Sequence, residues 1–337
     1  MRVKADNDRS CRVTVPARSS ICVLDMNQFQ PGRAGGGNLG FALSAPTDLE
    51  ISASSRDEIV ASNGAPWRDE RRLILIHVID QWRIARHISG SYKVVVHQVN
   101  RPHIGLAASA ALQLAGWYGL DVLHGSVATE ALREKIASSY RESVNGLLVP
   151  GFTTGLSSFL GIAGGFAVVD TDLAPRVHFK VPNWTAAVVI DPSTAAVGFG
   201  DAEIQTLTGR AAELDAKARV AKDDIVNEVL IPAVAAANLR VIGEAIGDLQ
   251  SIGSKVAEID LYGERISRQL VTLRHEFECV FMSAVGPGIV VLSSHSPSDV
   301  TKALSRFPVT VVSLGNVDNL GVTVNGQVCA SAPESST

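Results

Sequence analysis

The chain is poor in cysteine and in aromatic residues, and long apolar runs are missing from it. Its four cysteines are scattered without a C-x-x-C spacing, which argues against a disulfide framework and a zinc site. No segment offers roughly 18 uninterrupted apolar residues, and no signal-peptide pattern opens the chain. We therefore expect a soluble cytoplasmic protein with reduced thiols.

A strong charge of either sign is also missing. Thirty basic side chains stand against thirty-four acidic ones, for a net charge of −4. Such a chain has no global field that would attract nucleic acid or an anionic membrane, so we expect neither as a partner. Any anionic ligand must be held locally. The 337 residues, 46% of them hydrophobic, are enough for one large α/β unit or two domains.

The apolar pattern predicts helices and strands in mixed order. Helices are expected at 68–89, 105–120, 128–147, 223–254 (kinked at Pro232) and 258–277. Strands are expected on both sides of a turn at 16–18 and at 91–99, 165–169, 186–191, 308–314 and 320–325. We interpret 175–182 as a connection, and Lys222, Asp223 and Asp224 as a solvated helix start. The predicted domains are 1–175 and 176–329, followed by a polar tail at 330–337.

Three loops of small residues recur along the chain, at Gly105–Ala111, Gly151–Ser158 and Ser283–Gly288. A further glycine-rich stretch lies at 31–40. Such loops let backbone N–H groups close on phosphate oxygens, above all at a helix N-terminus. The alternative for the first loop is a small-residue helix packed on a sheet.

The segment Pro102-His103-Ile104-Gly105-Leu106 resembles the phosphate loop of the GHMP kinases, and the third loop resembles their C-terminal glycine motif. The resemblance implies an α+β, GHMP kinase-like two-domain fold with mixed sheets and packed helices. Those kinases place a catalytic acid in the second motif. Residues 153–165 contain no Asp or Glu, which disfavours phosphoryl transfer to a hydroxyl.

A group without that acid fits better. The chain resembles the β-ribofuranosylaminobenzene 5'-phosphate synthases and the related C-nucleoside synthases of formycin and pyrazofurin biosynthesis. The shared motifs, in order, are Leu24-Asp25-Met26-Asn27, Gly32-Arg33-Ala34-Gly35-Gly36-Gly37, His103-Ile104-Gly105-Leu106, Thr153-Thr154-Gly155-Leu156-Ser157 with Gly164-Gly165, and Ser283–Pro287.

The resemblance implies an enzyme that couples phosphoribosyl pyrophosphate (PRPP) to an amino-aromatic carboxylic acid. A C–C bond forms, pyrophosphate and carbon dioxide leave, and Mg²⁺ assists. Alanines at 34, 107, 108, 110 and 111 replace residues usual in the synthases and favour 4-amino-pyrazole-3,5-dicarboxylate as acceptor. The alternatives are 4-aminobenzoate or 4-hydroxybenzoate as acceptor, a small-molecule kinase that uses ATP, and a regulator without catalysis. We also expect a homodimer.

The expected catalytic residues are Asp25, Arg33 and His103, with Asp25 also the Mg²⁺ ligand. Asp25 could instead cap a turn, and Arg33 could be a solvated loop residue. The acid of the acceptor is assigned to Arg101 or Lys180. The expected substrate-binding residues are Asn27, Gly35, Gly36, Gly37, Gly105, Leu106, Ser109, Thr153, Thr154, Gly155, Ser157, Ser158 and Lys180.

Overall fold

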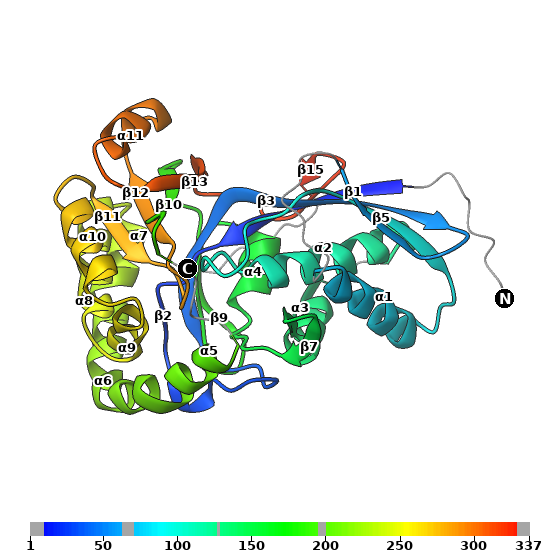
Figure 1. Ribbon diagram of the computed structural model, residues 1–337, viewed down its shortest axis with the longest axis horizontal. Coiled ribbons are helices and arrows are strands. Elements are labelled where there is room, and N and C mark those ends of the chain that lie inside the picture. The colour runs from blue at the N-terminus through cyan, green and yellow to red at the C-terminus, as the bar shows by residue number, and fades with distance from the viewer. Residues whose placement is uncertain (1–9, 63–70, 127–128, 195–199, 329–337) are drawn as a thin grey trace.

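A computed structural model describes residues 10–62, 71–126, 129–194 and 200–328 of the chain (Figure 1). It contains two main sheets, joined by one extensive apolar core. The predicted polar tail at 330–337 lies outside the described residues.

The larger sheet is mixed and runs in the order β15-β14-β1-β3-β5-β4. Strand β1 pairs antiparallel with β3 and, at its other edge, with β14, where Val13 lies opposite Val324. Strands β2, β8 and β9 extend the sheet beside β3 or β8. The bounds are β1 Ser10–Arg18, β2 Cys22–Val23, β3 Asn38–Ser54, β4 Glu58–Ala61, β5 Ser91–Gln98, β8 Phe166–Val169, β9 Pro175–Phe179, β14 Thr323–Val324 and β15 Gln327–Val328.

Four helices gather beside this sheet, and α2 and α4 pack directly on β1 (Figure 1). They are α1 (Arg72–Arg86), α2 (Ala108–Leu123), α3 (Thr129–Ser139) and α4 (Leu156–Ala163). Helix α2 is buried along nearly its whole length, as its run of small and apolar residues requires.

The second sheet is antiparallel, in the order β11-β12-β10-β13, and lies with the later helices at the other end of the molecule (Figure 1). Its strands are β10 Thr185–Ile190, β11 Cys279–Met282, β12 Ile289–Ser293 and β13 Thr310–Asn316. The helical elements are α5 Asp201–Thr206, η3 Leu207–Ala211, α6 Ala212–Asp224, η4 Ile225–Leu230, α7 Ile231–Ala235, α8 Leu239–Gln250, α9 Ser254–Asp260, α10 Glu264–Arg274 and α11 Pro297–Leu304. The largest core packs β3 and β8 against this sheet and α8.

Two predicted connections are strands. Residues 16–18 do not turn the chain: β1 continues through Pro16 with a register shift between Val15 and Ala17. A bulge tolerates proline because one residue there leaves the ladder. The stretch 175–182 contains β9, which pairs with β8.

Three predicted long helices are interrupted. The helix expected at 128–147 ends at Ser139, and β6 (Arg141–Val144) and β7 (Leu147–Pro150) form a hairpin. Its turn residues, Asn145 and Gly146, both have positive φ, as the tight hairpin turn of an Asn-Gly pair demands.

The helix expected at 223–254 breaks at Ala237, which has φ +53, and Asn238 caps α8 by accepting the Val241 N–H. The preceding π-helical turn η4 ends just before Pro232, whose nitrogen has no proton to donate. The helix expected at 258–277 is likewise divided into α9 and α10 around Gly263. The domain division at residue 175 stays a prediction.

Candidate functional site

The first and third small-residue loops are packed backbone to backbone. A Cβ built on Gly105, whose φ is +84, would lie 1.9 Å from the Ser283 carbonyl oxygen. The Ser283 hydroxyl donates to the Gly105 carbonyl at 2.7 Å and accepts the Ser20 N–H at 3.0 Å. Glycine is therefore required at 105 for the two loops to meet.

The second loop is joined to the glycine-rich stretch at 31–40. The Gly32 N–H donates to the Gly151 carbonyl at 2.9 Å, and the Gly35 N–H donates to the Thr153 carbonyl at 3.1 Å. Residues of all four segments line one pocket, although the segments are far apart in the sequence: Asn38, Gly105, Thr153 and Gly286.

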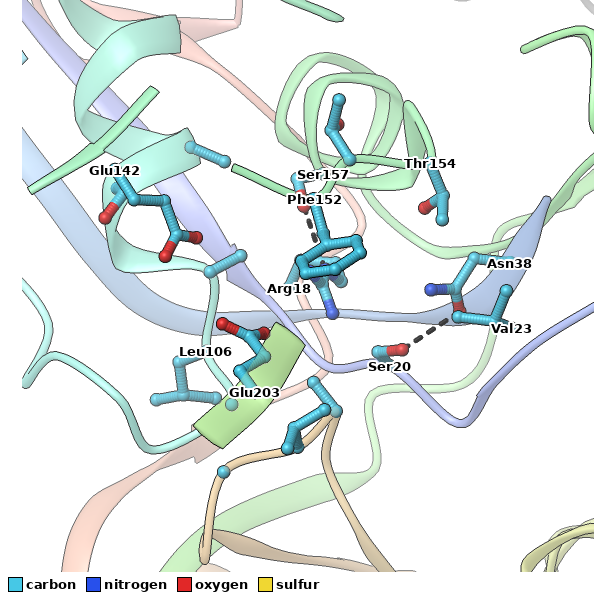
Figure 2. Close-up of a pocket in the computed structure, with 18 of the residues that line it drawn as sticks. Arg18, Ser20, Val23, Asn38, Leu106, Glu142, Phe152, Thr154, Ser157 and Glu203 are labelled. Carbon is cyan, nitrogen blue, oxygen red and sulfur yellow. Dashed lines mark hydrogen bonds between the residues drawn. The ribbon is translucent and has the colours of Figure 1, made fainter. Parts of the chain in front are cut away.

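A pocket lies where these segments meet, and two helices begin at its wall (Figure 2). Helix α2 follows Ala107, and α4 follows Gly155; neither residue provides a side-chain cap. The N–H groups of the first helical turns are therefore available to an anion, and both helix dipoles favour negative charge. Residues from the first turn of each helix line the pocket: Ala108, Ser109, Ala110 and Ser157.

Arg18, at the end of β1, also lines this pocket. Its Nε donates to the Ser157 hydroxyl at 2.9 Å, whereas its buried Nη1 has no hydrogen-bond partner (Figure 2). Burial lowers the pKa of Arg18 to about 10, which leaves the guanidinium charged at neutral pH. A buried cationic donor without a partner is costly, and an anionic ligand would satisfy it.

Three carboxyl groups face the same pocket: Glu142, Glu203 and Glu258. Burial raises the pKa of Glu142, although the hydrogen bond from Tyr140 at 2.6 Å and the charge of Arg18 oppose the change. Burial and the charges of Glu142 and Glu258 raise the pKa of Glu203 well above its ordinary value. Figure 2 shows Glu142 and Glu203 on the same side of the pocket. Two like charges in one site disfavour each other, and a cation would relieve this repulsion.

Glu258 is paired within the fold. The Lys255 ammonium donates to its carboxylate and to the Ala284 carbonyl, each at 2.8 Å, and both side chains are buried. Among the described residues, no group of three or more His, Cys, Asp or Glu side chains is arranged to hold a metal ion.

Seven of the predicted site residues line the pocket together. Six come from the first and second loops and His103 precedes the first, and all stay candidates: His103, Gly105, Leu106, Ser109, Thr153, Thr154 and Ser157.

The other predicted residues lie outside the pocket lining. Asp25 accepts the Asn27 N–H at 3.0 Å and forms an ion pair with Arg219, which is the turn-capping alternative. Asn27 and Arg33 are exposed, as is Arg101. Lys180 donates to the backbone carbonyls of Ala163 and Asn319.

The remaining predicted glycines and Ser158 allow close backbone approaches or form hydrogen bonds within the loops. A Cβ on Gly36 would lie 3.0 Å from the Asp25 carbonyl oxygen, and one on Gly37 would lie 2.9 Å from that of Val169. Gly35 pairs with Thr153, Gly155 precedes α4 at φ +77, and the Ser158 hydroxyl donates to the Gly155 carbonyl at 3.0 Å.

Lys222 is not part of a solvated helix start. It lies within α6, is 1% exposed, and forms an ion pair with the equally buried Asp215. Its ammonium also donates to the Val23 carbonyl at 2.7 Å and the Leu24 carbonyl at 3.0 Å. The sequence gives no signal for this role because Lys-Asp-Asp is typical of an exposed helix terminus.

Sequence reasoning missed Arg18, Glu142 and Glu203. Arg18 ends strand β1 but lies within the turn that the sequence predicts at 16–18, and Glu142 lies in a hairpin that the sequence predicts to be helical. Glu203 follows Gly200 at the start of α5, in a region for which the sequence offers no motif. For Arg18, the one sequence signal is an arginine at the end of a strand that precedes a glycine-rich region, a pattern that could indicate an anion-binding residue.

Comparison with solved structures confirms the predicted α+β fold, which is that of the GHMP kinases. The galactokinase of Lactococcus lactis superimposes with a TM-score of 0.69 at 13% identity, over 94% of this chain and 96% of that one. The homoserine kinase of Cytophaga hutchinsonii gives 0.65 at 17% identity, over 96% and 99%. The mevalonate pyrophosphate decarboxylase of Streptococcus pyogenes gives 0.62 at 16% identity, over 94% and 99%.

Among curated proteins, the chain is similar to the β-ribofuranosylphenol 5'-phosphate synthase of Archaeoglobus fulgidus. The two are 25% identical over 313 residues, which cover 88% of this chain and 92% of the relative. This similarity supports the predicted resemblance to ribofuranosyl 5'-phosphate synthases, whereas the C-nucleoside branch stays a prediction. No family model matches the chain. In the described parts of the chain, every helix is too short or too polar to cross a membrane.

Proposed function

We propose that the protein is a phosphoribosyltransferase that couples PRPP to an aromatic carboxylic acid, with release of pyrophosphate and carbon dioxide. The observation that carries the proposal is the Arg18 guanidinium, whose buried Nη1 has no hydrogen-bond partner, in a pocket where two uncapped helices begin. PRPP has phosphate groups at both ends of its ribose, so it offers an anion to each helix. The similarity to the archaeal synthase supports the same reaction.

The reaction needs little beyond binding and electrostatics. The ring carbon that bears the carboxylate attacks the anomeric carbon, and the C–O bond to pyrophosphate breaks with its electron pair going to the leaving group. The bond to the carboxylate then breaks, carbon dioxide departs, and the released electron pair restores the aromatic ring. Arg18, the N–H groups of α2 and α4, and the hydroxyls of Ser109 and Ser157 would stabilise the phosphate charges.

Mg²⁺ is part of the proposal, and Glu142 and Glu203 fit it better than Asp25 does. Their raised pKa values reflect burial and, for Glu203, repulsion from neighbouring carboxylates, which a divalent cation would relieve. Asp25 is engaged by Arg219 and by the turn that it caps. Mg²⁺ is usually held by one or two carboxylates together with substrate phosphates. When bound, it would neutralise charge on the departing pyrophosphate.

For the acceptor, we propose 4-amino-pyrazole-3,5-dicarboxylate, with 4-aminobenzoate and 4-hydroxybenzoate as alternatives. The alanines around the start of α2 favour the first. Incubation of the protein with Mg²⁺, PRPP and each acceptor, followed by mass spectrometry, tests the choice. We expect pyrophosphate release and a decarboxylated C-riboside with one acceptor, and no release in EDTA. Release that is equal in EDTA, or a product that keeps the carboxylate, would refute the mechanism.

A small-molecule kinase remains the second candidate because the structural neighbours include kinases. The second loop lacks the acid that those enzymes use, which disfavours it. The same incubation with ATP and candidate alcohols separates the two functions: formation of ADP would support the kinase and overturn the transferase.

A further inference from the structure

We propose that Phe29 and Phe152 form the surface that binds the aromatic ring of the acceptor, an inference that rests on the proposed ribosyl transfer. Both rings line the pocket and are partly buried, with centroids 4.8 Å apart and planes inclined by 33°. Phe29 follows the 3-10 turn η1 (Met26–Gln28), and Phe152, in the second loop, lines the same pocket as Arg18 and Ser157 (Figure 2).

The two rings belong to an apolar cluster of the fold that contributes several side chains to the pocket lining. Val23, Leu207 and Val285 line the pocket in the same apolar cluster. The pocket lining therefore combines cationic and N–H donors with apolar side chains. A phosphoribosyl donor needs the polar groups, and a planar aromatic acid has a surface that matches the apolar ones.

Tyr140 is the third aromatic residue in the lining, but its chemistry differs. Its hydroxyl donates to Glu142 at 2.6 Å, which ties the ring to the carboxylates. Phe29 and Phe152 carry no polar group, so stacking and apolar contact are what they offer to a ligand.

Three charged residues of α6 hold the segment that carries Phe29. Asp215 accepts the Met26 N–H at 3.0 Å, Arg219 forms an ion pair with Asp25, and Lys222 donates to the carbonyls of Val23 and Leu24. Spacings of four and three residues place all three on one face of the helix. They are positioning residues: they fix the backbone on both sides of Asp25, and thereby the place of Phe29.

The test compares Phe152→Leu and Phe29→Leu with Phe152→Tyr, which keeps an aromatic ring. The matched control is Phe307→Leu, which removes a partly buried ring from the pair with Phe277 in another apolar cluster. We expect either pocket leucine to raise the KM of the acceptor about threefold to tenfold, and the KM of PRPP by less than about twofold. Phe152→Tyr should raise the KM of the acceptor less than Phe152→Leu does, and the control should behave like the wild type.

Calorimetry with 4-aminobenzoate and 4-hydroxybenzoate, in the presence of Mg²⁺ and pyrophosphate, reports the ring site without turnover. In one outcome, the wild type transfers no ribose while Phe152→Leu still weakens binding of the aromatic acid. That result would support the aromatic-binding surface of Phe29 and Phe152 and would refute the transferase function. Equal effects of Phe152→Leu on both substrates, or none on the acceptor, would overturn the ring site. Weakened binding of ATP alone would also overturn it, because the rings would then serve a nucleotide base.

Discussion

Asp25 and Arg219 form an ion pair that joins the turn before Phe29 to helix α6. We propose that this arrangement gives Asp25 a positioning role, whereas the Mg²⁺-binding role expected from its motif stays a prediction. We predict that Asp25→Asn and Arg219→Gln each raise the acceptor KM by a similar, few-fold factor, since a partly exposed pair contributes about 1 kcal/mol or less.

The Mg²⁺ dependence separates the two roles of Asp25. In both variants the Mg²⁺ concentration for half-maximal activity should stay at the wild-type value, and the double variant should be no worse than either single one. A tenfold higher Mg²⁺ requirement in Asp25→Asn alone would show that Asp25 binds the metal after all.

Arg18 and Arg33 provide a matched pair of arginine variants. Arg18 is inside the pocket, with Nη1 unpartnered, whereas Arg33 is exposed in its loop. Arg18→Ala should weaken PRPP binding by about 2 kcal/mol or more, because it removes one side of a charge-assisted contact. Arg33→Ala should bind within twofold of the wild type. Calorimetry measures the PRPP affinity of both variants. If Arg33→Ala binds PRPP more weakly than Arg18→Ala does, the phosphates of PRPP bind at the glycine-rich stretch 31–40 instead.

Gly105 should tolerate no side chain. In Gly105→Ala the new Cβ would meet the Ser283 carbonyl oxygen at 1.9 Å, in a left-handed backbone conformation. We expect a loss of stability on the order of 3 kcal/mol and loss of PRPP binding. Gly247→Ala is the control: a Cβ there would lie 3.9 Å from its nearest atom outside the backbone of α8, in Arg274, so alanine should raise stability by about 0.5 to 1 kcal/mol. Thermal unfolding of the two variants measures the contrast, and equal midpoints would contradict it.

Asp191 makes stability depend on pH. Burial alone would raise its pKa, but the hydrogen bonds from Ser193 and the charges and donors of Arg265 and Gln269 hold the pKa below its ordinary value. A folded-state pKa below the unfolded one stabilises the protein above about pH 4, and this contribution is lost as the pH falls further. Asp191→Asn should therefore cost about 1 to 2 kcal/mol at pH 7 and progressively less below pH 4.

Unfolding in urea at several pH values measures that difference. Asp224→Asn, at an exposed position on α6, provides the control and should match the wild type throughout. A difference between Asp191→Asn and the wild type that stays constant down to pH 3 would mean that the carboxylate charge is not the cause.

The sequence can locate the motifs whose backbone conformation is determined by neighbouring residues. Gly105 and Gly155 mark a left-handed backbone, and Ser109 and Ser157 follow at helix starts, so the residues alone predict that these loops meet a ligand. Their gathering in one pocket follows from the fold that the loops imply.

Residues placed by distant contacts cannot be found in the same way. Glu203 acquires its role from Glu142, sixty-one positions earlier, and Arg18 from Ser157. Lys222 shows the same limit, because a charged triplet indicates a solvent-exposed position unless its partners are known: Asp215 and the carbonyls of Val23 and Leu24. Side-chain type and local spacing carry no information about such partners.

The pairing of β1 with β14 has a consequence for how the chain folds during its synthesis. Val13 finds its partner in Val324, and the Asn325 N–H donates to the Arg12 carbonyl at 2.8 Å. During synthesis, β1 leaves the ribosome long before β14, which pairs with its outer edge, has been translated. The backbone groups of β1 that pair with β14 therefore have no partner strand while the helices between them are translated. Contacts of such long sequence separation also form slowly. A nascent chain of this protein is therefore most exposed to faulty association just before its last strands emerge, when chaperones would have the greatest effect on its yield.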